Sequence, residues 1–183
     1  MCVGKQIVLA ASYEAKAYGV GTGTPVREAK KLLPRDAVFC DVNFLLYGTI
    51  SQQLVAFLRT LSPDVRPASI DEAFINLSGQ ANSEQGFADY ASWLKHEIKA
   101  KIGIPVSIGI AHTKLLAKLG ASSSKPFGSC ALLEEKTIQE LLVQTAVSKI
   151  SFIGRKTAPK LQALCRHAED FRQLDYFLVK QLL

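Results

Sequence analysis

The spacing of hydrophobic positions predicts helices and strands along the whole chain. Apolar residues recur every three or four positions at 44–61 and 86–102, which indicates two long amphipathic helices. Short apolar runs bounded by turn residues predict strands, at 7–11, 37–41, 105–111 and, as a hairpin, at 65–69 with 73–77.

Capping and breaking residues predict the shorter helices. Ser12 can cap a helix that ends near Gly19, and Pro25 suits the first position of a helix that ends before Pro34. Further helices are expected at 113–122, 137–147, 156–164 and 171–182. The order is mixed α and β first and helical last, so the expected fold class is α/β (α+β).

Composition narrows the class of protein. Hydrophobic residues make up 48% of the 183 positions, which favours a folded core over a disordered tail. A formal net charge of +6 favours a polyanionic partner, because bound phosphates release counterions. No apolar run is long enough to span a bilayer, so no membrane partner is expected. The widely spaced cysteines and histidines fit free groups in a reducing cytoplasm rather than a zinc site.

The acidic pair Asp71-Glu72 is the central chemical signal. It stands within Ala68-Ser-Ile-Asp-Glu-Ala-Phe-Ile-Asn-Leu77, between apolar strand residues. Neighbouring residues of a strand face opposite sides, so both carboxylates cannot be buried comfortably, and a cation relieves their repulsion. An exposed acidic turn with no ligand is the other reading of the dipeptide.

Three further segments combine polar groups with strand and helix patterns. In the segment 11–20, Tyr13 and Lys16 lie three residues apart and share a helix face. The segment 109–118, followed by Ser124-Lys-Pro-Phe-Gly128, reads as a strand, a turn and a basic helix. The segment 150–161 reads as two helices joined by a hairpin. Taken singly, the first two are also compatible with ordinary helices, and the third with a plain helix-turn-helix pair.

In their order and spacing, these four segments resemble the Y-family of lesion-bypass DNA polymerases, close to bacterial DNA polymerase IV and the SOS-mutagenesis polymerases. The string around Asp71 is similar to the Ser-Ile-Asp-Glu-Ala signature of the family's palm. The hairpin resembles the helix-hairpin-helix of its thumb, usually Pro-Gly-Ile-Gly-x-x-Thr-Ala. The resemblance extends over about residues 7–174.

The resemblance implies a role for each matching residue. Asp71 and Glu72 are the expected catalytic metal ligands for two Mg²⁺ ions, and Tyr13, Lys16 and Lys125 are expected to hold the dNTP triphosphate. The residues expected to contact DNA phosphates are Gly154, Arg155, Lys156 and Lys160. Two positions depart from the family pattern. Lys16 stands where many members have Arg, and Phe152 replaces the first hairpin glycine, which disfavours a tight turn.

The resemblance also implies a domain plan. Fingers are expected at 1–41, a ferredoxin-like palm lacking its first strand at 42–133, and a small thumb with the helix-hairpin-helix at 134–183. The family's first strand carries an Asp that binds both metals and a gate aromatic, and nothing before Ile7 matches it. Asp41-Val-Asn-Phe44 is superficially similar but follows the Tyr13 segment, so it is not assigned this role.

The function expected from the resemblance is that of a lesion-bypass polymerase core acting in DNA repair. It would transfer nucleotides from dNTPs to a primer–template DNA in the cytoplasm, with a sliding clamp as a partner through a missing C-terminal region. Without the first catalytic segment, we expect the chain to be inactive alone. The alternative is a catalytically dead DNA-binding or interaction remnant.

Overall fold

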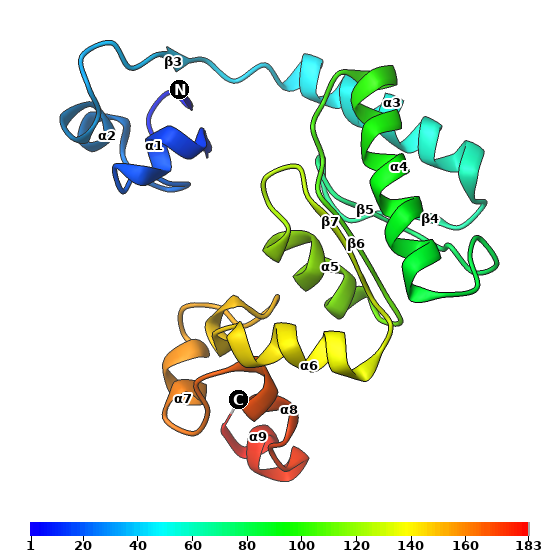
Figure 1. Cartoon of the computed structure of the whole chain (residues 1–183). Helices are drawn as coiled ribbons and strands as arrows, with labels where there is room; N and C mark the ends of the chain where they lie inside the picture. The colour runs from blue at the N-terminus through cyan, green and yellow to red at the C-terminus, as the bar shows by residue number, and fades with distance from the viewer. Residues whose placement is uncertain (183) are drawn as a thin grey trace. The chain divides into compact units, whose positions relative to one another are not determined.

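The computed structural model describes residues 1–182 and divides into two compact units, Met1–Gln52 and Gln53–Leu183 (Figure 1). Each unit is described by itself. Within the described residues, no helix is both long enough and apolar enough to cross a membrane.

The first unit is a small three-stranded sheet with two short helices. Strand β1 (Cys2–Val3) lies between β2 (Ala10–Ala11), which runs antiparallel to it, and β3 (Phe39–Cys40), which runs parallel. Helices α1 (Tyr13–Ala17) and α2 (Val26–Leu32) contribute to its core. The buried core residues are Cys2, Val8, Ala15, Val20, Ala29 and Leu33.

Local capping explains where these helices start. The Ser12 hydroxyl accepts a hydrogen bond from the Ala15 backbone N–H at 3.4 Å, which confirms Ser12 as the cap of α1. Pro25 is the residue before α2 rather than its first helical residue, so that prediction was wrong by one position. Helix α3 (Phe44–Leu61) has the predicted bounds, and the Asn43 side chain accepts from the Leu46 N–H at 3.0 Å.

The second unit contains two two-stranded sheets. Strands β4 (Val65–Pro67) and β5 (Ala73–Ile75) form the predicted antiparallel hairpin. Strands β6 (Ile108–Ala111) and β7 (Ser129–Leu132) are parallel, and helix α5 (Lys114–Ser123) makes the connection that parallel strands require.

Helix α4 (Glu84–Ile102) covers both sheets (Figure 1). Its Leu94 and Ile98 pack with α3, while Ala91 packs with β6 and β7. Ile75, Tyr90 and Ile108 contribute to both clusters, so one apolar layer underlies the β5 and β6 strands. The spacing of these residues on α4 is the helical period that predicted the element.

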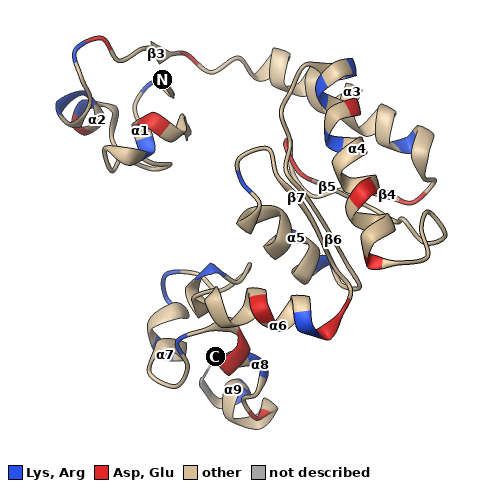
Figure 2. Cartoon of the chain, in the orientation of Figure 1, with Lys and Arg blue, Asp and Glu red and all other residues tan. Residues whose placement is uncertain are grey.

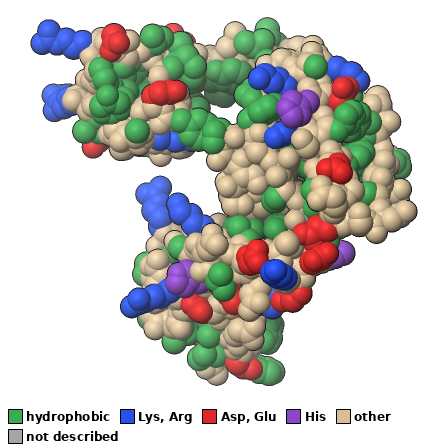
Figure 3. Space-filling model, in the orientation of Figure 1, with side chains coloured by type: hydrophobic (Ala, Val, Ile, Leu, Met, Phe, Trp, Pro, Cys, Tyr) green, Lys and Arg blue, Asp and Glu red, His purple; other side chains and the backbone are tan. Residues whose placement is uncertain are grey.

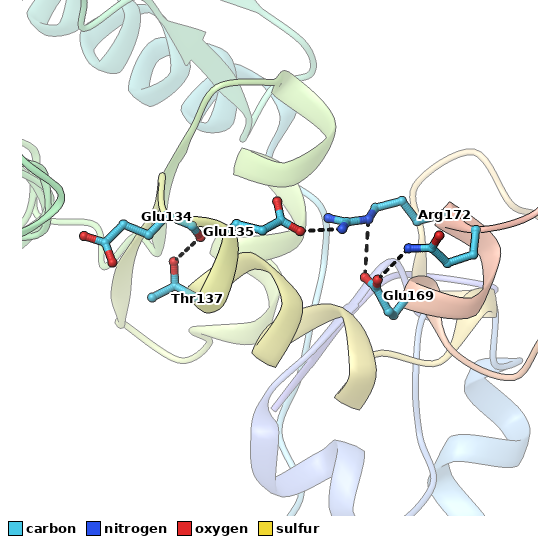
Figure 4. Close-up of polar contacts among 6 residues, drawn as sticks. Glu134, Glu135, Thr137, Glu169 and Arg172 are labelled. Atoms are coloured by element: carbon cyan, nitrogen blue, oxygen red, sulfur yellow. Dashed lines mark hydrogen bonds and ion pairs between the residues drawn. The ribbon is translucent and has the colours of Figure 1, made fainter.

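The C-terminal part of this unit is helical. It contains α6 (Glu135–Gln144), a 3₁₀ turn η1 (Val147–Lys149), α7 (Ala158–Gln162), α8 (Ala168–Arg172) and α9 (Tyr176–Leu182). Its core is continuous with α5 and β7 through Leu119 and Leu132, and its fully buried members are Val147 and Leu161. Arg172 links α8 to α6 by pairing with Glu135, and its Nε lies 3.4 Å from Glu169 Oε2 (Figure 4).

Several predicted elements need correction. Strands β1 and β7 were not predicted, because each is short and pairs with residues distant in sequence. The strand predicted at 7–11 is reduced to β2, and Ile7 makes only an isolated bridge to Pro25. The single helix predicted at 171–182 is broken into α8 and α9. Asp175 causes the break, since its side chain caps the N–H groups of Phe177 and Leu178 at 2.9 and 3.1 Å.

Candidate functional site: an acidic turn, two basic loops and a helix face

The Asp71-Glu72 pair lies in the turn between β4 and β5. The Glu72 carbonyl accepts from the N–H groups of Ala68 and Ser69 at 2.8 and 3.1 Å, which closes the turn. Asp71 Oδ1 accepts from the Ser69 hydroxyl at 2.6 Å. Both acidic residues are exposed, so the turn presents two carboxylates to solvent.

Helix α5 lies against this acidic turn. Lys118 Nζ is 2.6 Å from Glu72 Oε2, and Lys114 Nζ lies 5.5 Å from the centre of the Phe74 ring. The two lysines are about one helical turn apart, and their partners, Glu72 at the end of the turn and Phe74 in β5, are two residues apart. A rise of about 6 Å over four helical residues matches about 6.7 Å over two strand residues. Sequence reasoning missed Lys118, although its spacing from Lys114 was a usable signal.

Two glycines allow α5 to seat closely on its sheet. A Cβ at Gly109 would lie 2.1 Å from the Ala117 carbonyl oxygen and 2.4 Å from the Ala121 nitrogen. A Cβ at Gly120 would lie 2.8 Å from both Cys130 Sγ and a Leu132 methyl carbon. The close approach therefore depends on glycine, and it sets how near Lys118 comes to Glu72.

Lys125 is exposed in the tight loop that follows α5. Phe127 has a φ of 49°, and a Cβ at Gly128 would lie 2.1 Å from the Ser124 carbonyl oxygen. Lys95 of α4 donates a hydrogen bond to the Phe127 carbonyl at 3.0 Å. The Phe127 ring lies 5.0 and 4.9 Å from the ammonium groups of Lys95 and Lys99. Helix α4 thus anchors the loop two residues beyond Lys125.

The site residues of the second unit do not form a closed cluster. Within residues 1–182, no group of three or more His, Cys, Asp or Glu side chains could hold a metal on its own. Asp71 and Glu72 come from the hairpin turn, and Lys125 comes from the separate loop after α5. Their roles at one site remain a prediction.

The remaining predicted nucleotide ligands lie on α1 of the first unit. Lys16 Nζ is 4.8 Å from the centre of the Tyr13 ring, so the two side chains share a helix face as predicted. Both residues are exposed. The pKa of the neighbouring Glu14 is lowered by a hydrogen bond from the Ser12 hydroxyl and by one from the backbone N–H of Glu14 itself.

The hairpin between η1 and α7 forms a tight turn despite its phenylalanine. The Ile153 N–H donates to the Ile150 carbonyl at 3.1 Å, and Phe152 at the third position of this turn has a φ of 75°. Glycine is favoured at such a position, and a larger residue costs about 1–2 kcal/mol. The tight turn therefore forms even though Phe152 disfavours it, and Phe152 accepts the strained backbone.

The residues after this turn have backbone N–H groups that could donate hydrogen bonds to a ligand. In the described part of the chain, the backbone N–H groups of Gly154, Arg155 and Lys156 donate to no oxygen atom. Charged residues in 141–168 are all basic: Lys149, Arg155, Lys156, Lys160 and Arg166. Figure 2 shows the segment that leads into α7 with Lys and Arg but without Asp or Glu.

Comparison with known proteins gives one family. The model of the impB/mucB/samB family matches residues 1–122. DNA polymerase IV of Oceanobacillus iheyensis is 34% identical over 180 residues, which is 98% of this chain and 42% of that protein. DNA polymerase IV 2 of Mesorhizobium japonicum is 36% identical over 161 residues, covering 88% of this chain and 38% of that protein.

Solved structures agree with the sequence match. DinB from Sulfolobus solfataricus has a TM-score of 0.83 at 27% identity, over 99% of this chain and 54% of that one. A structure described as an insertion ternary complex of Dbh DNA polymerase also has a TM-score of 0.83 at 27% identity, over 96% of this chain and 51% of that one. The chain thus spans less than half the length of the curated relatives named here, and about half of these structures. The chain belongs to the impB/mucB/samB family, the Y-family of DNA polymerases.

Proposed function

We propose that the chain is the core of a template-directed DNA polymerase for lesion bypass. It would transfer a nucleotide from a dNTP to a primer 3′-hydroxyl. The observation that carries the proposal is the exposed Asp71-Glu72 turn, fixed on its hairpin and approached by Lys118 of α5. Relatives named DNA polymerase IV and the likeness to a Dbh ternary complex support it.

The acidic turn fits divalent cations by its chemistry. Asp71 and Glu72 are exposed carboxylates, which are the ligands that Mg²⁺ prefers, and Mg²⁺ keeps waters and substrate oxygens in the rest of its shell. Two Mg²⁺ ions, when bound, would activate the primer hydroxyl and stabilise the charge of the leaving pyrophosphate. Asp71 would contact both ions and Glu72 the ion on the primer side, once Lys118 yields its place on Glu72.

Cationic and hydroxyl groups would hold the triphosphate. Tyr13 and Lys16 present a phenol and an ammonium on one face of α1, and Lys125 presents a mobile ammonium on an anchored loop. Lysine suits phosphate as a compact charge, although it lacks the two-pronged grip of arginine. These groups would orient the nucleotide for attack rather than take part in proton transfer.

The segment from η1 to α7 would contact primer–template DNA as a helix-hairpin-helix. The backbone N–H groups of 154–156 and the side chains of Arg155, Lys156 and Lys160 would contact phosphates, which position DNA without reading its sequence. We place the fingers at 1–41, the palm at 42–133 and the thumb at 134–183. A sliding clamp is a further proposed partner, and the cytoplasm, where bacterial DNA is replicated, is the proposed compartment.

We also propose that the palm sheet takes an additional strand between β5 and β6. These strands are not paired with each other in the described residues, yet both pack on the apolar layer shared with α4. Unpaired strand edges expose backbone donors and acceptors that another strand can satisfy. In the family this strand brings the Asp that binds both metals.

Single-nucleotide insertion tests the polymerase proposal. The chain is assayed with Mg²⁺, dNTPs and primer–template DNA, alone and with a family-type strand-helix fused before Met1. We expect little insertion by the chain alone. The fused protein should insert nucleotides and have a higher Tm, and its activity should be lost on Asp71→Ala or on mutation of the added Asp. Higher stability without insertion, even at high Mg²⁺, would contradict the enzyme proposal.

That second outcome would favour a catalytically dead, DNA-binding remnant. The feature that favours this alternative is that Asp71 and Glu72 pair within the chain with Ser69 and Lys118. Both candidate functions include DNA binding, so a DNA-binding assay cannot distinguish them. The insertion assay decides between them.

A further inference from the structure

Two positions in the hairpin, 152 and 154, have residues that the local backbone does not favour: a phenylalanine stands where glycine is preferred, and a glycine where none is needed. Phe152 has a φ of 75°, where glycine is preferred. Gly154 has no such φ, and a Cβ added there would meet nothing within 4 Å. The fold alone would accept glycine at 152 and almost any residue at 154.

Packing does not explain Phe152. Its side chain is 97% exposed, so the ring gains no burial that could offset the strained backbone. Strain that the fold does not require is found where a side chain serves a function. An exposed ring at the tip of a turn is in position to contact another molecule.

The charge of the surroundings indicates the kind of molecule. The charged residues flanking Phe152 from 141 to 168 are all basic, and Lys149, Arg155 and Lys156 are exposed. Lys and Arg side chains project from the C-terminal helical part in Figure 3. Gly154 leaves the backbone open to close approach by a bulky group such as a phosphate. An aromatic ring among cations and open backbone amides suits a nucleic acid, which offers apolar sugar and base faces between its phosphates.

We propose that Phe152 is a DNA-contacting residue that packs its ring against a deoxyribose or base face, while Gly154 and the adjacent basic residues contact the flanking phosphates. The inference rests on the proposed DNA binding by this hairpin and adds an apolar contact to it. Such a contact strengthens binding to any sequence, because every nucleotide has an apolar face.

The test is fluorescence anisotropy of the 183-residue chain with labelled primer–template DNA over a range of salt concentrations. Phe152→Ala removes the ring but keeps a Cβ, and should weaken binding about tenfold with an unchanged salt slope. Phe152→Trp should restore affinity. Lys156→Ala should instead lower the log–log salt slope by about one. Phe177→Ala, which removes a Phe ring that is 70% exposed on α9, is the matched control and should bind like the parent.

Phe152→Gly gives a second, independent readout. It should raise Tm, because it relieves the positive φ without losing buried surface, and should weaken DNA binding as Phe152→Ala does. A purely structural role predicts the reverse for stability. 2-Aminopurine in the DNA distinguishes contact with a base from contact with a deoxyribose. Its fluorescence rises if the Phe152 ring unstacks a base and stays constant if the ring packs on the sugar.

The possible failures are distinguishable. If Lys156→Ala changes the salt slope but Phe152→Ala binds like the parent, the inference is wrong and the proposed DNA binding stands. If the parent binds no DNA at low salt, both are wrong. If Phe152→Ala abolishes self-association in sedimentation while DNA affinity is unchanged, the ring serves contacts between copies of the chain, and the inference is overturned.

Discussion

Replacing Gly109 by alanine tests whether the seating of α5 on β6 organises the second unit. The added Cβ would lie 2.1 Å from the Ala117 carbonyl oxygen and 2.4 Å from the Ala121 nitrogen, where real Cβ contacts are essentially never under 3.0 Å. Both atoms belong to the backbone of α5, so no side chain can rotate away. In a close-packed interior, the helix must move by roughly 1 Å.

The expected cost follows from this overlap. Overpacking costs about 1–3 kcal/mol, and rigid backbone on both sides places Gly109→Ala at the upper end, about 3 kcal/mol. For a chain of this size that lowers Tm by roughly 6–12 °C. The matched control is Gly48→Ala in α3, where an added Cβ meets nothing within 4 Å. Alanine favours a helix over glycine, so this variant should gain about 0.5–1 kcal/mol.

Thermal and urea unfolding, followed by circular dichroism, measure both changes. The glycine-to-alanine substitution should lower the stability of the chain at position 109 and raise it at position 48. The Gly109→Ala shift should also separate Lys118 from Glu72, so Lys118→Gln should cost less stability in that background than in the parent. A neutral Gly109→Ala, or two variants that change in the same direction, would refute the role assigned to the close α5–β6 contact.

Three further predictions concern charge and thiol chemistry. Lys118→Gln should tighten Mn²⁺ binding about thirtyfold by electron paramagnetic resonance, because removing a unit charge about 4 Å from a divalent ion is worth roughly 2 kcal/mol in water. Lys114→Gln is the control, and weaker binding would mean that Lys118 holds Glu72 in place for the metal. Hydrogen bonds from the backbone N–H groups of His167 and Arg166 lower the pKa of Asp170, so its stabilising effect is present above the ordinary aspartate pKa and is lost as pH falls through the depressed value. Asp170→Asn should therefore lower Tm near neutral pH and converge with the parent in acid; a constant difference across pH would argue against this. Burial raises the thiol pKa of Cys130 and of Cys165, so iodoacetamide near neutral pH should modify both more slowly than Cys40. Peptide mass spectrometry measures the three rates, and equal rates would contradict the raised pKa of the two thiols.

The sequence by itself determined the elements whose cause is local. The period of apolar residues located α3 and α4, and Ser12 located the start of α1 by its cap. It also located the acidic turn and the basic hairpin, because motif residues close in sequence need no tertiary information. Their match to one family, in order and spacing, was sufficient to predict the family that the comparisons confirm.

Tertiary structure decided the features that join distant residues. Strands β1 and β7 are short, and their parallel partners lie 37 and 21 positions away in the sequence, so no local pattern predicts them. The Lys118–Glu72 pair and the Lys95 anchor of the Lys125 loop connect residues 46 and 32 positions apart. The structure also showed that the turn at Phe152 forms despite the unfavourable residue, because a bulky residue can adopt a positive φ when the surrounding turn fixes it. Local sequence sets which groups are available, and packing of the helices on the sheets sets which of them meet.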